Sequence, residues 1–200
     1  VVNVCLFIAS RARADDTHEF SAIDVQMEAG AKQKAGGLIV HHVGEFVQQK
    51  QKSNPRSVIV TVELGDQPIL ERYSSYHNGI CSGDLQRFAK FLWEVPTVDR
   101  CWAFQQSTVK ETTDFGGREH IFLWEGGVGQ FRAFVCERLG ENLIGSWIRG
   151  EAAWGKNGIL VSAMGQLPVS LYSGDLFDDN SVAVIPADAN HLPSIWAFMS

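Results

Sequence analysis

Long hydrophobic stretches are absent from this sequence. No run reaches the roughly 18 apolar residues that a membrane-spanning helix needs, so we expect no membrane partner. The opening stretch VVNVCLFIA, residues 1–9, is apolar but short, and no basic segment precedes it. It predicts a buried strand rather than a secretory signal.

Cysteine is scarce and shows no metal-binding spacing. The four cysteines, at positions 5, 81, 101 and 136, include no Cys-x-x-Cys pair. We expect free thiols in a reducing compartment, the cytoplasm, rather than disulfides. His41 and His42 are adjacent, and adjacent residues on a strand point to opposite faces. We therefore expect no metal site.

Positive charge is in deficit. The chain has 17 Lys and Arg against 23 Asp and Glu, a formal net charge of −6. This balance argues against a nonspecific nucleic-acid coat protein, which is normally basic. It leaves a local basic groove open, because recognition depends on where the charges lie.

Standard nucleotide-binding motifs are also missing. The stretch IFLWEGGVGQFRAFVCERLG, residues 121–140, has the strand, glycine loop and helix order of a nucleotide site. Its GGVG matches neither Gly-x-Gly-x-x-Gly nor a loop ending in Gly-Lys-Ser/Thr. A glycine-rich turn between a strand and a helix is the simpler interpretation.

Hydrolase and calcium-loop patterns are absent as well. Ser107 and Ser162 lack the Gly-x-Ser-x-Gly context of a nucleophile, so we expect no catalytic residue in this chain. Asp175, Asp178 and Asp179 lack the alternating ligands and closing Glu of a calcium loop. A turn explains this acidic cluster better.

The sequence does contain many short apolar segments separated by glycine-containing turns, which predict an α+β fold, rich in strands after residue 57. We predict that residues 1–10 and 18–25 form a hairpin and that the polar stretch 26–53 is helix-prone. Further strands are predicted at 57–64, 102–108, 121–125, 159–164, 168–172 and 181–186, and helices at 85–94, 130–139 and 190–198.

The segment GSWIRGEAAWGKNG, residues 145–158, combines two tryptophans and two cations with four glycines. Arg and Lys can bind phosphates or guanine, Gln can pair with adenine, and glycine lets a backbone approach a ligand closely. Packing of the tryptophans in a core, and an Arg149–Glu151 ion pair, are the alternatives. The candidate contact residues in or beside glycine-rich turns are Arg87, Gln105, Gln106, Arg118, Trp147, Arg149, Trp154 and Lys156.

Several motifs in order resemble one known family. They are YHNGICSGDLQRFAKFLWE, QQST, TTDFGGREHIFLWEGG and the stretch from GSWIRGEAAWGKNG to HLPSIWAF. From about residue 73 to its end, the chain resembles the C-terminal part of bacterial restriction-modification DNA adenine methyltransferases, of the fused or BREX type used in phage defence.

The resemblance implies a Rossmann-like domain that binds S-adenosylmethionine and methylates a flipped adenine. The hallmark Asn/Asp-Pro-Pro-Tyr/Phe tetrapeptide of that domain is not in this sequence, because Asn54-Pro55 is followed by Arg56-Ser57. We therefore expect part of a larger enzyme that uses S-adenosylmethionine, with no cofactor bound by this part and no methylation by it alone. A fused nuclease domain stays an open question.

The same resemblance suggests three regions. Residues 1–25 would be the last hairpin of the methyltransferase domain, 26–54 a linker or helical connection, and 55–200 a target-recognition domain. The expected partners are double-stranded DNA and the rest of the polypeptide. The expected DNA contacts are Arg87, Gln105, Arg118, Trp147, Arg149, Trp154 and Lys156. The alternative is a β-rich module that binds carbohydrate or protein through exposed tryptophans.

Overall fold

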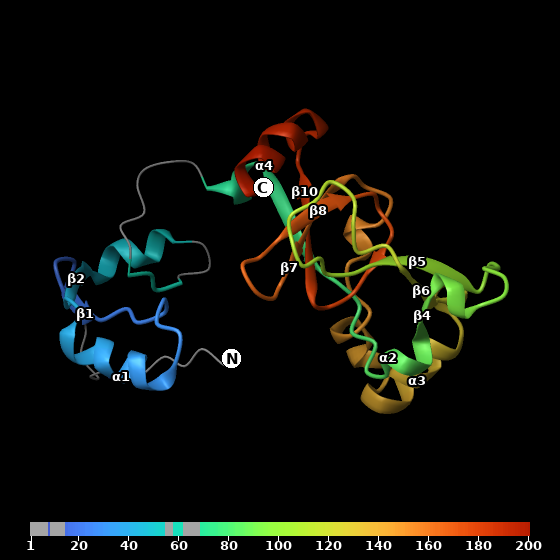
Figure 1. The fold of residues 1–200 in the computed structure, drawn as a ribbon, viewed down its shortest axis with the longest axis horizontal. Coiled ribbons are helices and arrows are strands. Elements are labelled where there is room, and N and C mark those ends of the chain that lie inside the picture. Colours follow the sequence, from blue (N-terminus) through green and yellow to red (C-terminus); the bar gives the residue numbers. More distant parts are fainter. Residues whose placement is uncertain (1–7, 9–14, 55–57, 62–68) are drawn as a thin grey trace. The chain divides into compact units, whose positions relative to one another are not determined.

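A computed structural model describes residues 8, 15–54, 58–61 and 69–200 of the chain. The chain divides into two compact units, Val1–Gln67 (unit 1) and Pro68–Ser200 (unit 2), drawn in Figure 1. Both helices and strands are present, with several sheets and few helices, so the predicted α+β class is confirmed at this level.

Unit 1 is built on a two-stranded antiparallel sheet. Strand β1 (Glu19–Ala22) pairs with β2 (Gly44–Val47), and helix α1 (Ala31–Val40) lies between them in the sequence. A 3-10 helix, η1 (Gln48–Ser53), follows. The rings of Phe20 and Phe46, which are direct partners across the sheet, lie 5.6 Å apart. The predicted helical region therefore contains a helix and also the second strand of this sheet.

Two predicted strands of unit 1 need comment. The first strand of the predicted hairpin, 1–10, lies outside the described residues except for Ile8, and the described partner of β1 is β2. The strand predicted at 57–64 is wrong for its described part, 58–61, which forms no strand. Asn54 Nδ2 donates to Val58 O at 2.7 Å, and Val60 N donates to Gln51 Oε1 at 2.9 Å. These side chains bind backbone groups that a neighbouring strand would otherwise bind.

Unit 2 contains two four-stranded sheets. The first has the order β3-β10-β7-β8 and is antiparallel throughout. The second has the order β4-β6-β5-β9 and is antiparallel except for the parallel pair β5-β9. The first sheet consists of β3 (Ser74–Asn78), β7 (Gly158–Ser162), β8 (Val169–Tyr172) and β10 (Ser181–Pro186). The second consists of β4 (Ala89–Phe91), β5 (Trp102–Gln106), β6 (His120–Leu123) and β9 (Leu176–Phe177).

Three α-helices and six 3-10 helices complete unit 2. The α-helices are α2 (Leu85–Phe88), α3 (Gln130–Leu139) and α4 (Leu192–Met199). The 3-10 helices are η3 (Leu70–Arg72), η4 (Leu92–Glu94), η5 (Glu125–Gly127), η6 (Glu141–Ser146), η7 (Glu151–Ala153) and η8 (Ala189–His191). The predicted helix at 130–139 is confirmed, and Gly140 ends it with a φ of 81°.

The helix predicted at 85–94 is wrong beyond its first turn. Asp84 caps the helix, because its carboxylate accepts a hydrogen bond from Arg87 N at 3.2 Å. The chain then leaves α2 and enters β4, where Ala89 pairs with Phe122 and Phe91 with His120. Pairing with a distant strand outweighs the local helical pattern.

Three apolar clusters form the core of unit 2. The largest joins α2 and α3 to the second sheet through the fully buried rings of Phe88, Phe122 and Phe131. A second lies around Leu160, Tyr172 and Phe177, and a third joins Ile195 of α4 to the first sheet. Each aromatic pair in the largest cluster is tilted or edge-to-face, the arrangement that aromatic rings favour.

Candidate functional site

The two tryptophans of the glycine-rich segment are packing residues. Trp154 is half-buried and contacts two of the apolar clusters, with its ring edge-on to Trp124 at 5.3 Å. Trp147 is also half-buried, and its ring lies 6.2 Å from Phe134. A Cβ on Gly83 would lie 2.2 Å from the Trp147 ring, so the neighbouring turn requires glycine there. The segment therefore uses its tryptophans mainly to join parts of the core.

Of the two cations of the same segment, Arg149 lies beside the C-terminal end of β3. Arg149 Nε donates to Gly79 O at 3.1 Å, and its Nη2 lies 4.0 Å from Asp179 Oδ2. Its ion-pair partner is thus Asp179 rather than Glu151. Lys156 is exposed and acts electrostatically on His77: burial lowers the pKa of His77, and the charge of Lys156 lowers it further. We refer to Arg149 and Lys156 as the cation pair.

Two glycines place the backbone that holds Arg149. Gly79 lies close to the acidic turn, which contains Asp175, Asp178 and Asp179. A Cβ on Gly79 would lie 2.1 Å from Asp178 O. Ile80 N donates to Phe177 O at 2.8 Å, which ties this stretch to β9. Gly150 has a φ of 89°, a conformation that side chains other than glycine rarely adopt. The local sequence therefore fixes Arg149 against the end of β3.

Arg87 and Trp147 are brought together on a different part of unit 2. The guanidinium of Arg87 lies 4.8 Å from the Phe88 ring centre and 5.3 Å from that of Phe134. Trp147 packs on the same Phe134 ring. Arg87 is exposed, and among the described residues no carboxylate forms an ion pair with it. Its cation is therefore available to a ligand.

Gln105 and Arg118 line a pocket of about 330 Å³ beside β5, which we call the β5 pocket. Both come from sequence candidates, and the neighbouring candidate Gln106 lines it too. Four other residues complete the lining and had not been selected as contacts: Leu92, Phe104, Phe115 and Asp175. Phe104 and Phe115 are exposed aromatic residues. Their sequence positions alone do not show that they lie beside Gln105 and Arg118, because that depends on how β5 pairs in the sheet.

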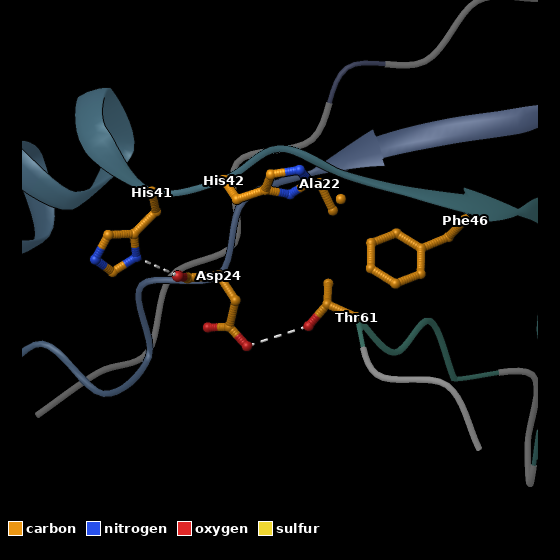
Figure 2. A pocket seen from close by; sticks show the side chains of 7 residues that line it. Ala22, Asp24, His41, His42, Phe46 and Thr61 are labelled. Atoms are coloured by element: carbon orange, nitrogen blue, oxygen red, sulfur yellow. Dashed lines mark hydrogen bonds between the residues drawn. The ribbon is translucent and has the colours of Figure 1, made fainter. Parts of the chain in front are cut away.

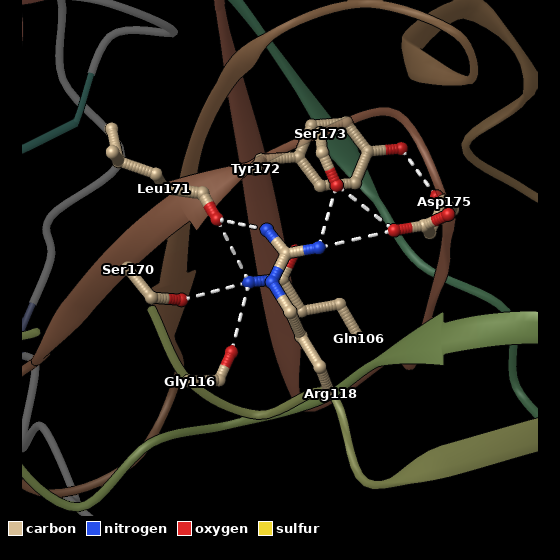
Figure 3. A network of polar contacts seen from close by, with 8 residues as sticks. All are labelled: Gln106, Gly116, Arg118, Ser170, Leu171, Tyr172, Ser173 and Asp175. Atoms are coloured by element: carbon tan, nitrogen blue, oxygen red, sulfur yellow. Dashed lines mark hydrogen bonds and ion pairs between the residues drawn. The ribbon is translucent and has the colours of Figure 1, made fainter. Parts of the chain in front are cut away.

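Arg118 and Gln106 belong to one polar network at this pocket (Figure 3). Arg118 Nη1 donates to Ser173 Oγ at 2.5 Å and to Asp175 Oδ2 at 3.1 Å, while Nη2 donates to Leu171 O at 2.8 Å. Gln106 Nε2 donates to three oxygens, on Gly116, Ser170 and Leu171, at 3.0–3.1 Å. The network holds both side chains in one position. The ion pair between Arg118 and Asp175 is part of it, so the two charges neutralise each other within the protein.

Three buried polar atoms of this pocket have no hydrogen-bond partner. They are Gln105 Nε2, Gln106 Oε1 and Arg118 Nε. Gln105 is 3% exposed and Gln106 is fully buried. Buried polar atoms normally have partners, so three unpaired atoms at one pocket require an explanation.

An exposed aromatic stack is a further feature that the sequence candidates omitted. Trp93 is 71% exposed, and its ring stacks on that of Phe91 at 4.6 Å with an interplanar angle of 9°. The His120 ring lies 4.5 Å from Phe91 on its adjacent strand. The sequence predicted a helix over residues 91–94, and that prediction gave no reason to choose Trp93 as a ligand-contact residue.

Unit 1 has a pocket of its own, about 380 Å³ in volume (Figure 2). His41 Nδ1 donates to Asp24 O at 3.0 Å, and its Nε2 lies 3.2 Å from Glu28 Oε1. Thr61 Oγ1 donates to Asp24 Oδ2 at 3.1 Å. Among the described residues, no group of three or more His, Cys, Asp or Glu side chains is placed to hold a metal ion.

The acidic turn of unit 2 contains a buried carboxylate. Asp178 accepts hydrogen bonds from Ser107 Oγ, from Ser181 Oγ at 3.0 Å and from Asn180 N at 3.2 Å. Burial raises the pKa of Asp178, and the bonds from Ser107 and Ser181 partly oppose this rise. The expected turn is therefore present, and Ser107 is a structural donor to it.

Comparison with known proteins gives no further assignment. No protein-family model matches the chain, and no curated protein matches it at a significant level. Within the described residues, no helix has the length and apolar character needed to cross a membrane.

Proposed function

We propose that unit 2 binds double-stranded DNA as the base-reading part of an S-adenosylmethionine-dependent DNA adenine methyltransferase. The observation that supports this most directly is the cation pair. Arg149 donates a hydrogen bond to Gly79 O, just after β3, and the charge of Lys156 lowers the pKa of His77 within β3. Two exposed or half-exposed cations associated with the same strand can bind phosphates, while base edges are read by other side chains.

The distribution of charge is compatible with binding despite the net charge of −6. Lys156 forms no ion pair within the described residues, and the nearest carboxylate oxygen to Arg149 is at the 4.0 Å limit of an ion pair. Arg118, by contrast, is neutralised by Asp175. The proposal therefore assigns phosphate binding to Arg149, Lys156 and Arg87, and gives Arg118 a role inside the β5 pocket.

In this proposal, methyl transfer takes place in a separate catalytic domain of the same polypeptide. That domain binds S-adenosylmethionine and the target adenine, as the resemblance of the sequence implies. The chain described here positions the DNA for that domain. Trp147 and Trp154 support the DNA-binding surface from within and do not contact the DNA.

The salt dependence of DNA binding tests the cation pair. Each lost phosphate contact lowers the slope of log affinity against log salt by about 0.9. We expect Lys156→Gln and Arg149→Gln each to lower this slope by about one, with little change in preference between DNA sequences. Fluorescence anisotropy with labelled duplex DNA at several salt concentrations measures it.

Lys32→Gln is the matched control, because Lys32 is an exposed cation of α1 in unit 1. It should leave the slope unchanged. An unchanged slope in both unit 2 variants would remove the cation pair from the interface. In the complete polypeptide, transfer of a labelled methyl group from S-adenosylmethionine to DNA adenine should fall in the same variants as salt increases.

The exposed Trp93–Phe91 stack favours a second candidate, a module that binds carbohydrate or protein. A flat aromatic pair can bind the apolar face of a sugar or a partner side chain as well as a base. If this candidate is correct, Trp93→Ala should abolish binding to an immobilised glycan or protein panel while Lys156→Gln does not. Loss of DNA binding in Lys156→Gln, with no ligand from the panel, would reject it.

A further inference from the structure

We infer that Arg87 of α2 and Arg138 of α3 together hold one phosphate group of the bound DNA, separate from the phosphates held by the cation pair. The inference rests on the proposed DNA-binding function. It adds Arg138, which neither the sequence candidates nor the proposal above include, and it gives Arg87 a partner. We refer to Arg87 and Arg138 as the arginine clamp.

Both arginines of the clamp lie over one aromatic ring of the core. The guanidinium carbon of Arg87 is 5.3 Å from the centre of the Phe134 ring, and that of Arg138 is 5.1 Å from the same centre. The Phe88 ring, 5.1 Å from Phe134, lies against Arg87 as well. Because Phe88 is fully buried and Phe134 is 8% exposed, the core fixes the place of both cations. Helices α2 and α3 are therefore joined at the point where the clamp forms (Figure 1).

Neither guanidinium has a partner anion in the part of the chain that the structure describes. Both side chains are exposed, and the ion pairs among the described residues use other cations. The hydrogen bond that Arg87 makes to Asp84 comes from its backbone N, which leaves its guanidinium open. Two like charges held over one ring repel each other, and a single anion between them offsets that repulsion.

A phosphate group has the chemistry that this pair can bind. A guanidinium that lies over a ring still presents the N–H groups at its edge to an acceptor. These N–H groups form a planar fork that matches phosphate oxygens two at a time. A phosphodiester of the DNA backbone has two free oxygens and one negative charge, so one phosphate can accept from both arginines.

The clamp and the cation pair are connected through two short segments. Trp147 packs on Phe134 at 6.2 Å, and Arg149 follows two residues later. Cys81 N donates to Trp147 O at 2.9 Å, just after Gly79, whose carbonyl holds Arg149. Segments 79–87 and 147–149 therefore carry or support residues of both sites, which is what a backbone-binding surface requires.

The number of phosphates lost in a double variant tests the clamp. Each phosphate contact contributes about 0.9 to the slope of log affinity against log salt. If both arginines hold one phosphate, we expect Arg87→Gln with Arg138→Gln to lower the slope by about 0.9. Two independent contacts would lower it by about twice that amount. Arg100→Gln is the matched control, because Arg100 is exposed, forms no ion pair with a described residue and should leave the slope unchanged.

Arg138→Lys tests whether the geometry of the clamp matters beyond its charge. Lysine keeps the positive charge but lacks the planar fork. We expect this variant to bind duplex DNA about threefold more weakly or worse, measured by fluorescence anisotropy with the full chain. Arg100→Lys is the control and should bind as the wild type does.

A second probe, inorganic phosphate, separates the clamp from the proposed function. We expect phosphate to raise the unfolding temperature of the wild type above that in chloride of equal ionic strength, and to do so less in the double variant. If the wild type binds no duplex, the DNA-binding function is rejected. A phosphate effect that the double variant loses would then keep the clamp as a site for a free phosphate group, and equal effects would overturn it.

If the wild type does bind duplex DNA, three results overturn the clamp and leave the DNA-binding proposal standing. They are an unchanged salt slope in the double variant, a fall of about twice 0.9, and wild-type affinity in Arg138→Lys.

Discussion

At the scale of single residues, burial decides what each polar or aromatic side chain does. Trp154 and Lys156 are two residues apart, yet Trp154 joins two apolar clusters and Lys156 is exposed. Asp178 is a carboxylate in a largely buried position, held by two serines. From residue type alone, Trp154 was predicted to contact a ligand and Asp178 to lie in a simple turn.

Asp178 should make stability depend on pH. Its folded pKa is raised by burial above the ordinary value of 3.8, so the folded state binds the proton more tightly than the unfolded state. Its contribution to stability is fully present below pH 3.8 and is lost as the pH rises through the folded pKa. We expect the free energy of unfolding of the wild type, minus that of Asp178→Asn, to fall over this window.

Urea unfolding at several pH values measures this difference. A difference between wild type and Asp178→Asn that stays constant with pH would show that the carboxyl titrates alike in both states.

Replacement of Trp154 tests its role in packing. Removal of a large aromatic side chain from a core costs about 3–5 kcal/mol. We expect Trp154→Ala to lower the free energy of unfolding by about 3 kcal/mol, near the low end because the residue is only half-buried. Trp93→Ala, at an exposed ring, should cost much less. Chemical unfolding followed by circular dichroism compares the two, and equal losses would contradict the assignment.

At the scale of elements, local pattern and distant pairing compete. Residues 130–139 form the predicted helix because glycines bound it on both sides and no strand competes for it. Residues 85–94 have a helical pattern of apolar residues, but β6 pairs with 89–91 and takes them into a sheet. The strands at 102–106, 158–162, 169–172 and 181–186 were predictable from β-branched and aromatic content. Their order in two sheets was not.

Gly79 connects the end of β3 to β9, and a side chain there should disrupt both. A Cβ at this position would lie 2.1 Å from the backbone oxygen of Asp178, and backbone cannot easily move. We expect Gly79→Ala to lower the free energy of unfolding by about 1–3 kcal/mol or more and to weaken the proposed DNA binding by displacing Arg149. Gly145→Ala is the control, because nothing lies within 4 Å of its added Cβ. Thermal unfolding that is equal in the two variants would contradict this view of Gly79.

At the scale of the whole molecule, all three apolar clusters belong to unit 2. We therefore expect residues 68–200 to fold without unit 1 and to carry the proposed salt-dependent DNA binding. A cooperative unfolding transition of this piece, followed by circular dichroism, checks the first expectation. A gradual transition without a folded baseline would show that unit 1 is required.

The same scale explains why the β5 pocket could not be found from sequence. Its lining comes from residues 92, 104–106, 115, 118 and 175, which only the assembled sheet brings together. Gln105 and Arg118 were selected for their chemistry, but nothing in their spacing showed that they share a pocket. Asp175 was assigned to a turn, and its ion pair with Arg118 depends on the tertiary fold.

The position of β10 in the first sheet has a consequence for synthesis. β10 lies between β3 and β7, although it is made long after β3. While the ribosome is still adding residues 79–180, β3 lacks its partner strand β10, and the backbone N–H and C=O groups that pair with β10 remain unpaired. In the second sheet, β4, β5 and β6 can pair before the edge strand β9 is made. The first sheet is therefore completed only when β10 emerges, and a chaperone that shields β3 on the nascent chain should raise the yield of native protein.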